Sequence, residues 1–191
     1  KILGMDRQQK TDKDIEAVKQ YSFSSFTQFK AVIGTMGYEV FQKDGNVFVK
    51  QGGRIQKKIP LAEIEALFKK GYQDKARNRQ LRAYLEKYRD VCANKEELQK
   101  EIKKNFGVDV VFFGKKDKPY GYMLIDHANK TVIHGARVLA VEELLDFATP
   151  EQRFDRIEAF IDQLLTLNPK ATQGEIFQKF KKQHAYIKKG V

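Results

Sequence analysis

The stretch EELQKEIKKNFGVDVVFFGKKDKPYGYMLIDHANKTVIHGARVLAVEELLDF (residues 96–147) repeats, in a longer form, the stretch FTQFKAVIGTMGYEVFQKDGNVFVKQGGRIQKKIPLAEIEALF (26–68). Each begins with apolar residues at helical spacing and then reaches a glycine, Gly37 or Gly107, which suits the left-handed position at a helix end. Each continues with the alternating apolar residues of a β-strand. The repeat predicts two modules of one design.

A turn, a second strand and a short helix complete each module. The turn is KDGN (43–46) in the first module and GKKDKPYG (114–121) in the second, which adds a third strand, TVIHG (131–135). The glycines are 70 residues apart but the closing Phe68 and Phe147 are 79 apart, so the second hairpin carries about nine extra residues. Because a lone hairpin is marginally stable, helices must cover each one.

Longer helical patterns precede the modules at 12–21, 77–92 and 153–167. The third leads into TQGEIFQKFKKQHAYIKKG, in which AYI stands where a strand would begin. We predict an α+β fold of tandem small modules, each a helix followed by a β-hairpin or three-stranded antiparallel sheet and a short helix, joined by longer helices. The predicted domains are 1–72 (first module with its leading helix), 73–150 (second module with a basic leading helix) and 151–191 (a helix and the start of a third, incomplete module).

The charge of the chain is strongly positive and unevenly spread. Lysine and arginine number 36 against 25 acids, a net charge of +11, which indicates an anionic partner such as nucleic acid, acidic protein or anionic lipid. Residues 43–58 hold five basic residues and one acid, 69–89 hold eight and two, and 137–162 hold three arginines and seven acids. This distribution favours a one-sided binding surface; a protein that is simply basic is the alternative.

The two basic stretches are the candidate nucleic-acid interface. The helix at 77–92 has one apolar face and carries its basic residues mainly on the other, where they suit phosphate contacts that give affinity without sequence selectivity. A basic hairpin beside this helix could follow a nucleic-acid backbone together with it. The alternative is that the basic residues of the helix simply form a solvated face. Phe48 and Tyr72 are candidates for stacking on bases, with core packing as the favoured interpretation of each. The predicted binding residues are Lys50, Arg54, Lys57, Lys58, Lys75, Arg77, Arg79 and Arg82.

The histidines do not predict a catalytic or metal site. Asp126 and Asn129 favour a turn that places His127 at a hairpin tip and His134 at the end of the next strand, while His184 lies in the tail. The chain has no HExxH, CxxC or P-loop pattern. We therefore expect no catalytic residue, metal or cofactor. Enzyme activity that rests on Asp126, His127 and His134 is the alternative.

Cysteine content and hydropathy predict a cytoplasmic protein without a membrane partner. Cys92 is the one cysteine, so an internal disulfide or a cysteine-based zinc cluster is excluded. No apolar run approaches the roughly 18 residues that span a bilayer. The opening KILGMDRQQK lacks a secretory signal and does not begin with Met, so we expect a processed or tagged chain or a fragment of a longer protein.

Residues 94–138 combine a helical stretch, the motif GVDVVF (107–112) and the hairpin motif YGYMLIDHANKTVIHG (120–135). In these motifs the segment resembles a region found downstream of the nuclease domain in relaxases, the mobilization proteins of conjugative elements, particularly those of Bacteroides-type bacteria. In that family a helix leads into GIDVVF and then into a YG…IDH…KTV…G hairpin. The resemblance covers roughly residues 94 to 140, with a weaker echo in 24–68. The matching residues are Leu98, Gly107, Val108, Asp109, Val110, Val111, Phe112, Tyr120, Gly121, Ile125, Asp126, His127, Lys130, Thr131, Val132 and Gly135.

The resemblance implies an accessory region without the nuclease. Relaxases cut one DNA strand with a tyrosine, assisted by a metal on a histidine cluster that normally includes an HxH pair, which this chain lacks. The chain also reads HGARV where relatives tend to read NGS. Together with the charge, the resemblance predicts a non-catalytic DNA-binding accessory module of a relaxase-type mobilization protein, with DNA favoured over RNA and other mobilization proteins as further partners.

The alternative is a protein-interaction module that docks on another mobilization or secretion component through the acidic helix 151–162 or the hairpin edges. Clustering of the predicted basic residues on one face would favour DNA. Their dispersal, together with an exposed apolar patch, would favour a protein partner.

Overall fold

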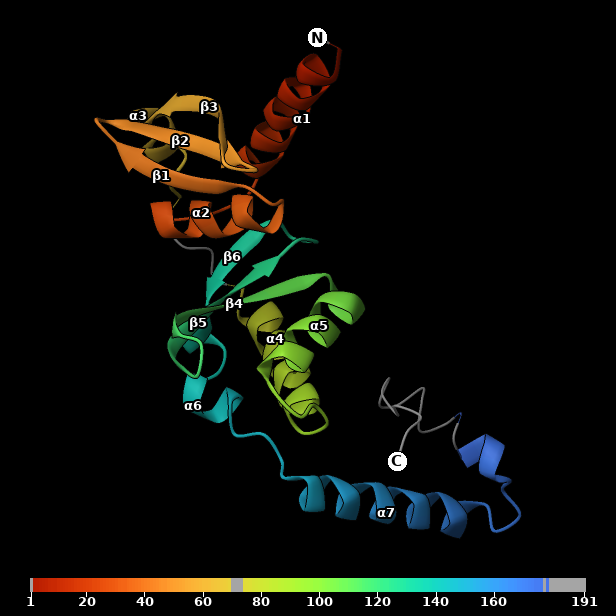
Figure 1. Ribbon diagram of the computed structural model, residues 1–191. Coiled ribbons are helices and arrows are strands. Elements are labelled where there is room, and N and C mark those ends of the chain that lie inside the picture. The colour runs from red at the N-terminus through yellow and green to blue at the C-terminus, as the bar shows by residue number, and fades with distance from the viewer. Residues whose placement is uncertain (1, 70–73, 177, 179–191) are drawn as a thin grey trace.

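The computed structural model describes residues 2–69, 74–176 and 178, which form two modules of the predicted α+β design and a separate long helix (Figure 1). Tyr72, Phe180, His184, the strand expected at AYI and the boundary expected between residues 72 and 73 lie outside the described residues. The first module consists of α1 (Ile2–Lys19), α2 (Phe26–Thr35), β1 (Glu39–Lys43), β2 (Asn46–Gln51), β3 (Arg54–Pro60) and α3 (Leu61–Glu65). The second consists of α4 (Lys75–Arg89), α5 (Lys95–Phe106), β4 (Val108–Lys115), β5 (Lys118–Asp126), β6 (Thr131–His134), the 3-10 turn η1 (Gly135–Arg137) and α6 (Val141–Leu144).

Side-chain caps and glycines bound α2 and α5, the helices that lead into the two sheets. The Ser25 hydroxyl accepts a hydrogen bond from the backbone of Gln28 at the start of α2, and Asn94 caps α5 in the same way. Gly37 and Gly107 follow these helices with φ of 85° and 62°. A side chain at such a φ would be strained, so the glycines stop both helices at the predicted places.

The first module holds one strand more than the sequence predicted. Its sheet 1 has the order β1-β2-β3 and is antiparallel throughout, so the expected two-stranded hairpin is wrong. Gly52 and Gly53 both have positive φ, at 56° and 78°, which is the geometry of the tightest hairpin turn. The basic segment after them therefore folds back on β2 as β3.

Sheet 2 in the second module has the order β4-β5-β6. The segment 126–130 forms the predicted turn between β5 and β6, with Lys130 at a φ of 48°. Ser22, from the link between α1 and α2, pairs with this sheet: its backbone donates to Lys130 and accepts from Val132. The first module therefore adds a backbone contact to the edge of sheet 2.

The modules stack as alternating layers. From top to bottom in Figure 1 the order is sheet 1, α2, sheet 2, and α4 with α5. Sheet 2 is covered on both sides: Leu124 and Ile133 pack with α4 and α5, whereas Met123, Ile125 and Val132 join the core of the first module. Sheet 1 buries one side on α1 and α2, so its other side is the free end of the stack.

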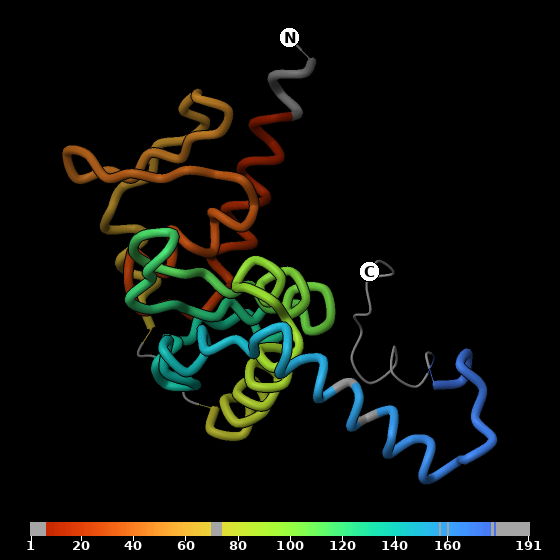
Figure 2. Tube along the Cα trace, turned by 60° about the horizontal axis from the view of Figure 1, so that its bottom comes forward, coloured from red at the N-terminus to blue at the C-terminus, as the bar shows by residue number. Residues whose placement is uncertain are grey.

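Helix α7 (Pro150–Leu167) leaves the stack and points away from it (Figure 2). Arginines near its start fix it to the loop after α4: Arg153 donates to the Cys92 carbonyl and Arg156 to the Asp90 carbonyl, each at 3.2 Å. Phe154 and Leu167 on this helix are 63% and 77% exposed. Within the described residues, every helix is too short or too polar to cross a bilayer.

Candidate nucleic-acid interface

The predicted basic residues lie in two separate places. Four are on β2 and β3 in sheet 1, and the other four are on α4, beyond sheet 2 (Figure 1). Helix α2 and sheet 2 lie between the two groups. The basic hairpin and the basic helix are therefore not side by side, contrary to our expectation, and a ligand would have to contact each group separately.

Arg77 has a structural position on α4. Its Nε donates to Asp126 Oδ2 at 2.7 Å, and its Nη1 donates to Gln80. The Asp126 side chain is fully buried, so its charge needs this partner. The same hydrogen bond raises the pKa of Arg77. Arg77 therefore joins α4 to the end of β5 and contributes little to a binding surface.

The other three predicted basic residues of α4 border a shallow pocket. Arg82 donates to Glu86 at 2.8 Å and to Glu143 at 3.5 Å, so acids offset much of its charge. The lining contains no aromatic ring, so the pocket offers phosphate contacts without a surface for base stacking. The pocket has a volume of about 390 Å³ and is lined by Lys75, Asn78, Arg79, Arg82, Arg137 and Val138.

The basic residues of sheet 1 divide between its two sides. Lys57 forms an ion pair with Asp12 of α1, on the covered side. Arg54 is exposed at the start of β3. Lys50 and Lys58 remain, and both belong to the free outer side of the sheet.

That outer side carries two stacked aromatic rings. Phe41 and Phe48 face each other in the register of β1 and β2, with ring centroids 5.2 Å apart and planes 11° apart. Their neighbours Val40, Val47 and Val49 point into the core, so alternation along the strands turns both rings outward. Phe41 is 40% exposed and Phe48 is half-buried outside the core, so the core-packing interpretation of Phe48 is wrong.

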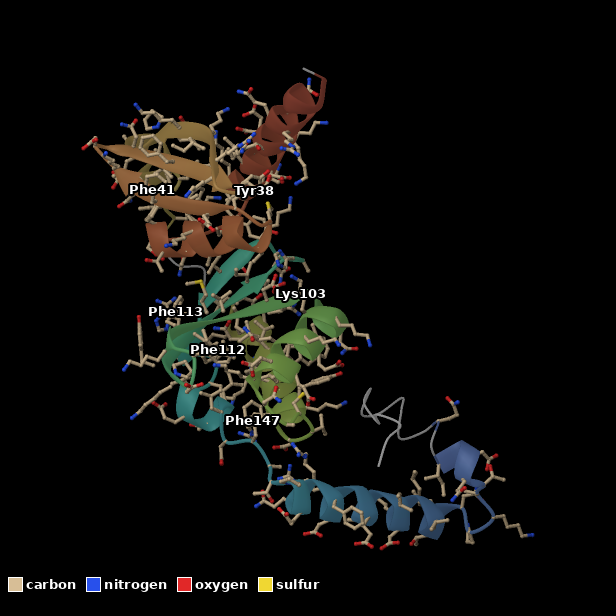
Figure 3. All side chains as sticks on the ribbon, in the orientation of Figure 1. Tyr38, Phe41, Lys103, Phe112, Phe113 and Phe147 are labelled. Carbon is tan, nitrogen blue, oxygen red and sulfur yellow. The ribbon has the colours of Figure 1, made fainter. Side chains whose placement is uncertain are left out.

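Lysines surround the two rings. The Lys58 ammonium lies 5.8 Å from the centre of the Phe48 ring, a cation–π distance. Lys43 and Lys50 flank the pair, and the acid on this side is Glu39, opposite Lys50. Among the residues that the structure describes, these three lysines form no ion pair. We define the first-sheet face as Phe41, Lys43, Phe48, Lys50 and Lys58; Figure 3 labels Phe41.

Sheet 2 provides a comparison within the same chain. Its registers place Val111 and Met123 where sheet 1 has Phe41 and Phe48. This side of sheet 2 packs on the first module, with Met123 and Ile125 only 3% and 0% exposed. The covered side thus has the composition of a core, whereas the first-sheet face combines rings with cations and suits a charged ligand that has flat groups.

The histidine-containing turn is part of the module contact. His127 is hydrogen-bonded through Nδ1 to the Tyr21 hydroxyl at 2.7 Å and through Nε2 to Asp109 at 2.6 Å. Asp126 is paired with an arginine, and His134 is exposed at the far end of β6. The three groups considered for catalysis therefore have separate surroundings and are not combined in one site. Over residues 2–69, 74–176 and 178, no cluster of three or more His, Cys, Asp or Glu could hold a metal.

Phe41, Lys43 and Arg137 are not among the residues that the sequence predicted. Phe41 and Lys43 point to the same outer side of the sheet as Phe48. Strict alternation along β1 from the buried Val40 would have identified both. Arg137 lies in η1, and only the tertiary fold brings it to α4.

Comparison with protein-family models, with curated proteins and with solved structures finds no match to this chain. The candidate interface is therefore defined by its own geometry and charge.

Proposed function

We propose that this protein is a non-catalytic nucleic-acid-binding module that holds single-stranded DNA on the first-sheet face. The observation that carries the proposal is the stacked Phe41–Phe48 pair, solvent-accessible and surrounded by three lysines without ion-pair partners. Bases stack on aromatic side chains, and lysines neutralise the phosphates between them. A single strand exposes its bases, whereas a duplex hides them in the stack. The geometry therefore supports a single strand over a duplex.

Affinity should depend on salt and only weakly on sequence. Lysines that neutralise phosphates release counterions on binding, so the affinity falls as salt rises. Ring stacking accepts every base because each has a flat face. The face has few polar side chains that could read base edges, apart from Glu39 and Asn46 at its ends.

Alanine substitution of the two rings tests the proposal. Fluorescence anisotropy with a labelled oligothymidine should show at least about tenfold weaker binding for F41A/F48A, because each stacked base contributes roughly 1–3 kcal/mol. The control is F154A, which removes a still more exposed phenylalanine from α7. Equal affinities of F41A/F48A and the wild type would contradict the proposal. Parallel titrations with duplex DNA and with oligouridine test the preferences for single strands and for DNA.

The cellular context that we propose, an accessory region of a relaxase-type mobilization protein, rests on the resemblance of residues 94–140. Several residues that carry it support the fold: Gly107 ends α5, Asp126 pairs with an arginine, and Gly135 lies against the Tyr122 ring. The resemblance therefore bears on architecture more directly than on chemistry. The buried free thiol of Cys92 supports a reducing cytoplasm as the compartment.

A protein-interaction module is the second candidate, and α7 favours it. Phe154 and Leu167 are exposed on a helix that also carries four acids, while both of its arginines are bound to the loop after α4. Exposed apolar residues next to acids suit a basic amphipathic partner. If the protein captures such a partner, F154A/L167A should abolish capture and leave nucleic-acid binding unchanged.

A further inference from the structure

The β4–β5 hairpin of the second module is longer than the β1–β2 hairpin of the first. Strands β4 and β5 have 8 and 9 residues, against 5 and 6 in β1 and β2, and the register of the longer pair shifts between Phe113 and Gly114. The end of this hairpin is exposed: Lys116 and Asp117 form the turn, and Lys115 and Lys118 are the strand ends next to it. Phe112 and Phe113 pack on the two cores, whereas residues 114–118 beyond them are exposed, so this end of the hairpin adds surface. Loops that extend from a rigid scaffold commonly carry binding residues.

Tyr120 is the largest exposed group that the longer hairpin supplies. It is 79% exposed, more than the other exposed apolar side chains among the described residues. A side chain at Gly114 would lie 2.7 Å from the Tyr120 ring, and the φ of 103° at this glycine is one that other residues rarely adopt. The Tyr120 ring therefore lies across the backbone of Gly114. It also stacks on the Phe113 ring, with the two ring centroids 6.4 Å apart. The fold fixes this ring while leaving most of it in water.

The turn is held in place and strongly basic. Lys95 at the start of α5 donates to the Lys116 carbonyl, which fixes the turn to the helix. Three exposed lysines against one aspartate, together with an open ring, repeat the chemistry of the first-sheet face. The β1–β2 and β4–β5 hairpins leave the stack on the same side, to the left in Figures 1 and 2. A strand that crosses the first-sheet face can therefore continue towards this turn.

We infer that the β4–β5 turn, with Tyr120, Lys115, Lys116 and Lys118, is a second contact for the same single strand, so that the two modules together set the length of nucleic acid bound. This inference rests on the proposed function. Its consequence is that affinity rises with oligonucleotide length beyond what the first-sheet face alone can contact. Single-strand sites commonly occupy roughly 4–16 nucleotides per module.

The test is a length series with matched variants. Anisotropy titrations compare oligothymidines of about 6 nucleotides, enough for one contact, and about 20 nucleotides, enough for two. In the wild type the longer strand should bind at least about tenfold more tightly than the shorter one, since a further stacked base is worth roughly 1–3 kcal/mol. Y120A should lose this gain and bind the short strand normally, while Y120F, which keeps the ring, should behave as the wild type.

The outcomes separate the two proposals. If Y120A keeps the full gain with length, or weakens both lengths equally, the turn is not a second contact, while the first-sheet face can still bind. If the wild type shows no gain with length, the inference is wrong as well. If the wild type binds neither oligonucleotide, or if F41A/F48A binds the short strand as the wild type does, the proposed function itself fails. Melting temperatures of all variants verify that each is folded.

Discussion

Arg77 Nε donates to Asp126 Oδ2 at 2.7 Å, and this ion pair connects the first turn of α4 to the buried end of β5. R77A should therefore lower the free energy of unfolding by about 3 kcal/mol, because it leaves a buried carboxylate without its partner. R79A, on the same helix but exposed, should change it by less than about 0.5 kcal/mol. Urea denaturation measures both. Equal effects of the two variants would show that the pair adds no stability.

The same carboxylate should make stability depend on acid pH. Burial acts to raise the pKa of Asp126, but the hydrogen bond and charge of Arg77, with hydrogen bonds from Asn129, outweigh it and hold the pKa below its usual value. A depressed folded-state pKa gives stability that is present above the unfolded pKa of about 3.9 and lost as the pH falls through the folded pKa.

Urea denaturation between about pH 5 and pH 2 checks this dependence. Wild-type stability should fall over that range more steeply than the stability of D126N, which has no carboxylate to titrate at this position. Parallel curves for the two proteins would contradict the assignment.

Two glycine-to-alanine substitutions should change the stability of the protein in opposite directions. A Cβ at Gly135 would lie 2.6 Å from the ring of Tyr122, which is 1% exposed and donates its hydroxyl to the Leu139 carbonyl. The ring has no room to move, so G135A should destabilise the protein by about 2 kcal/mol. Gly34 is exposed in α2 with no atom near its missing Cβ, so G34A should stabilise by about 0.5–1 kcal/mol. Thermal unfolding checks both predictions: the melting temperature of G135A should be lower than that of the wild type, and that of G34A higher.

Cys92 should be unreactive in the native state. Burial, followed by the nearby charges of Glu97 and Glu101, raises the pKa of its thiol to about 12. The thiolate is the reactive form, so its population at pH 8 is very small. A thiol-specific reagent at pH 8 should react slowly with the folded protein and rapidly in urea. Rapid reaction of the folded protein would show that the loop after α4 opens readily.

The repeat, the helix caps and the hairpin turns could be predicted because they depend on local sequence. Ser25, Asn94, Gly37 and Gly107 each act within a few residues of the chain. The third strand of sheet 1 was missed because β3 reads as a basic segment with few apolar residues. The paired glycines before it, Gly52–Gly53, identify the turn that folds it onto β2.

The candidate site could be predicted only in part, because charge in sequence does not specify partners in space. Arg77 and Lys57 belong to basic stretches, yet each is paired with an acid distant in the chain, Asp126 or Asp12. The separation of hairpin from helix by sheet 2 depends on how the modules stack. That stacking follows from apolar residues on both sides of sheet 2, a feature that local periodicity does not reveal.

The most direct test of the central claim is the salt-dependent binding of a labelled oligothymidine by two charge-matched triple variants. One is K43E/K50E/K58E in the first-sheet face; the other is K87E/K100E/K104E, three exposed lysines of α4 and α5. We predict that the wild type and the second variant bind with affinities that fall steeply between about 50 and 200 mM salt, and that the first variant loses at least about tenfold in affinity with a shallower salt dependence. Equal losses in the two variants would contradict the claim that the first-sheet face is the binding site.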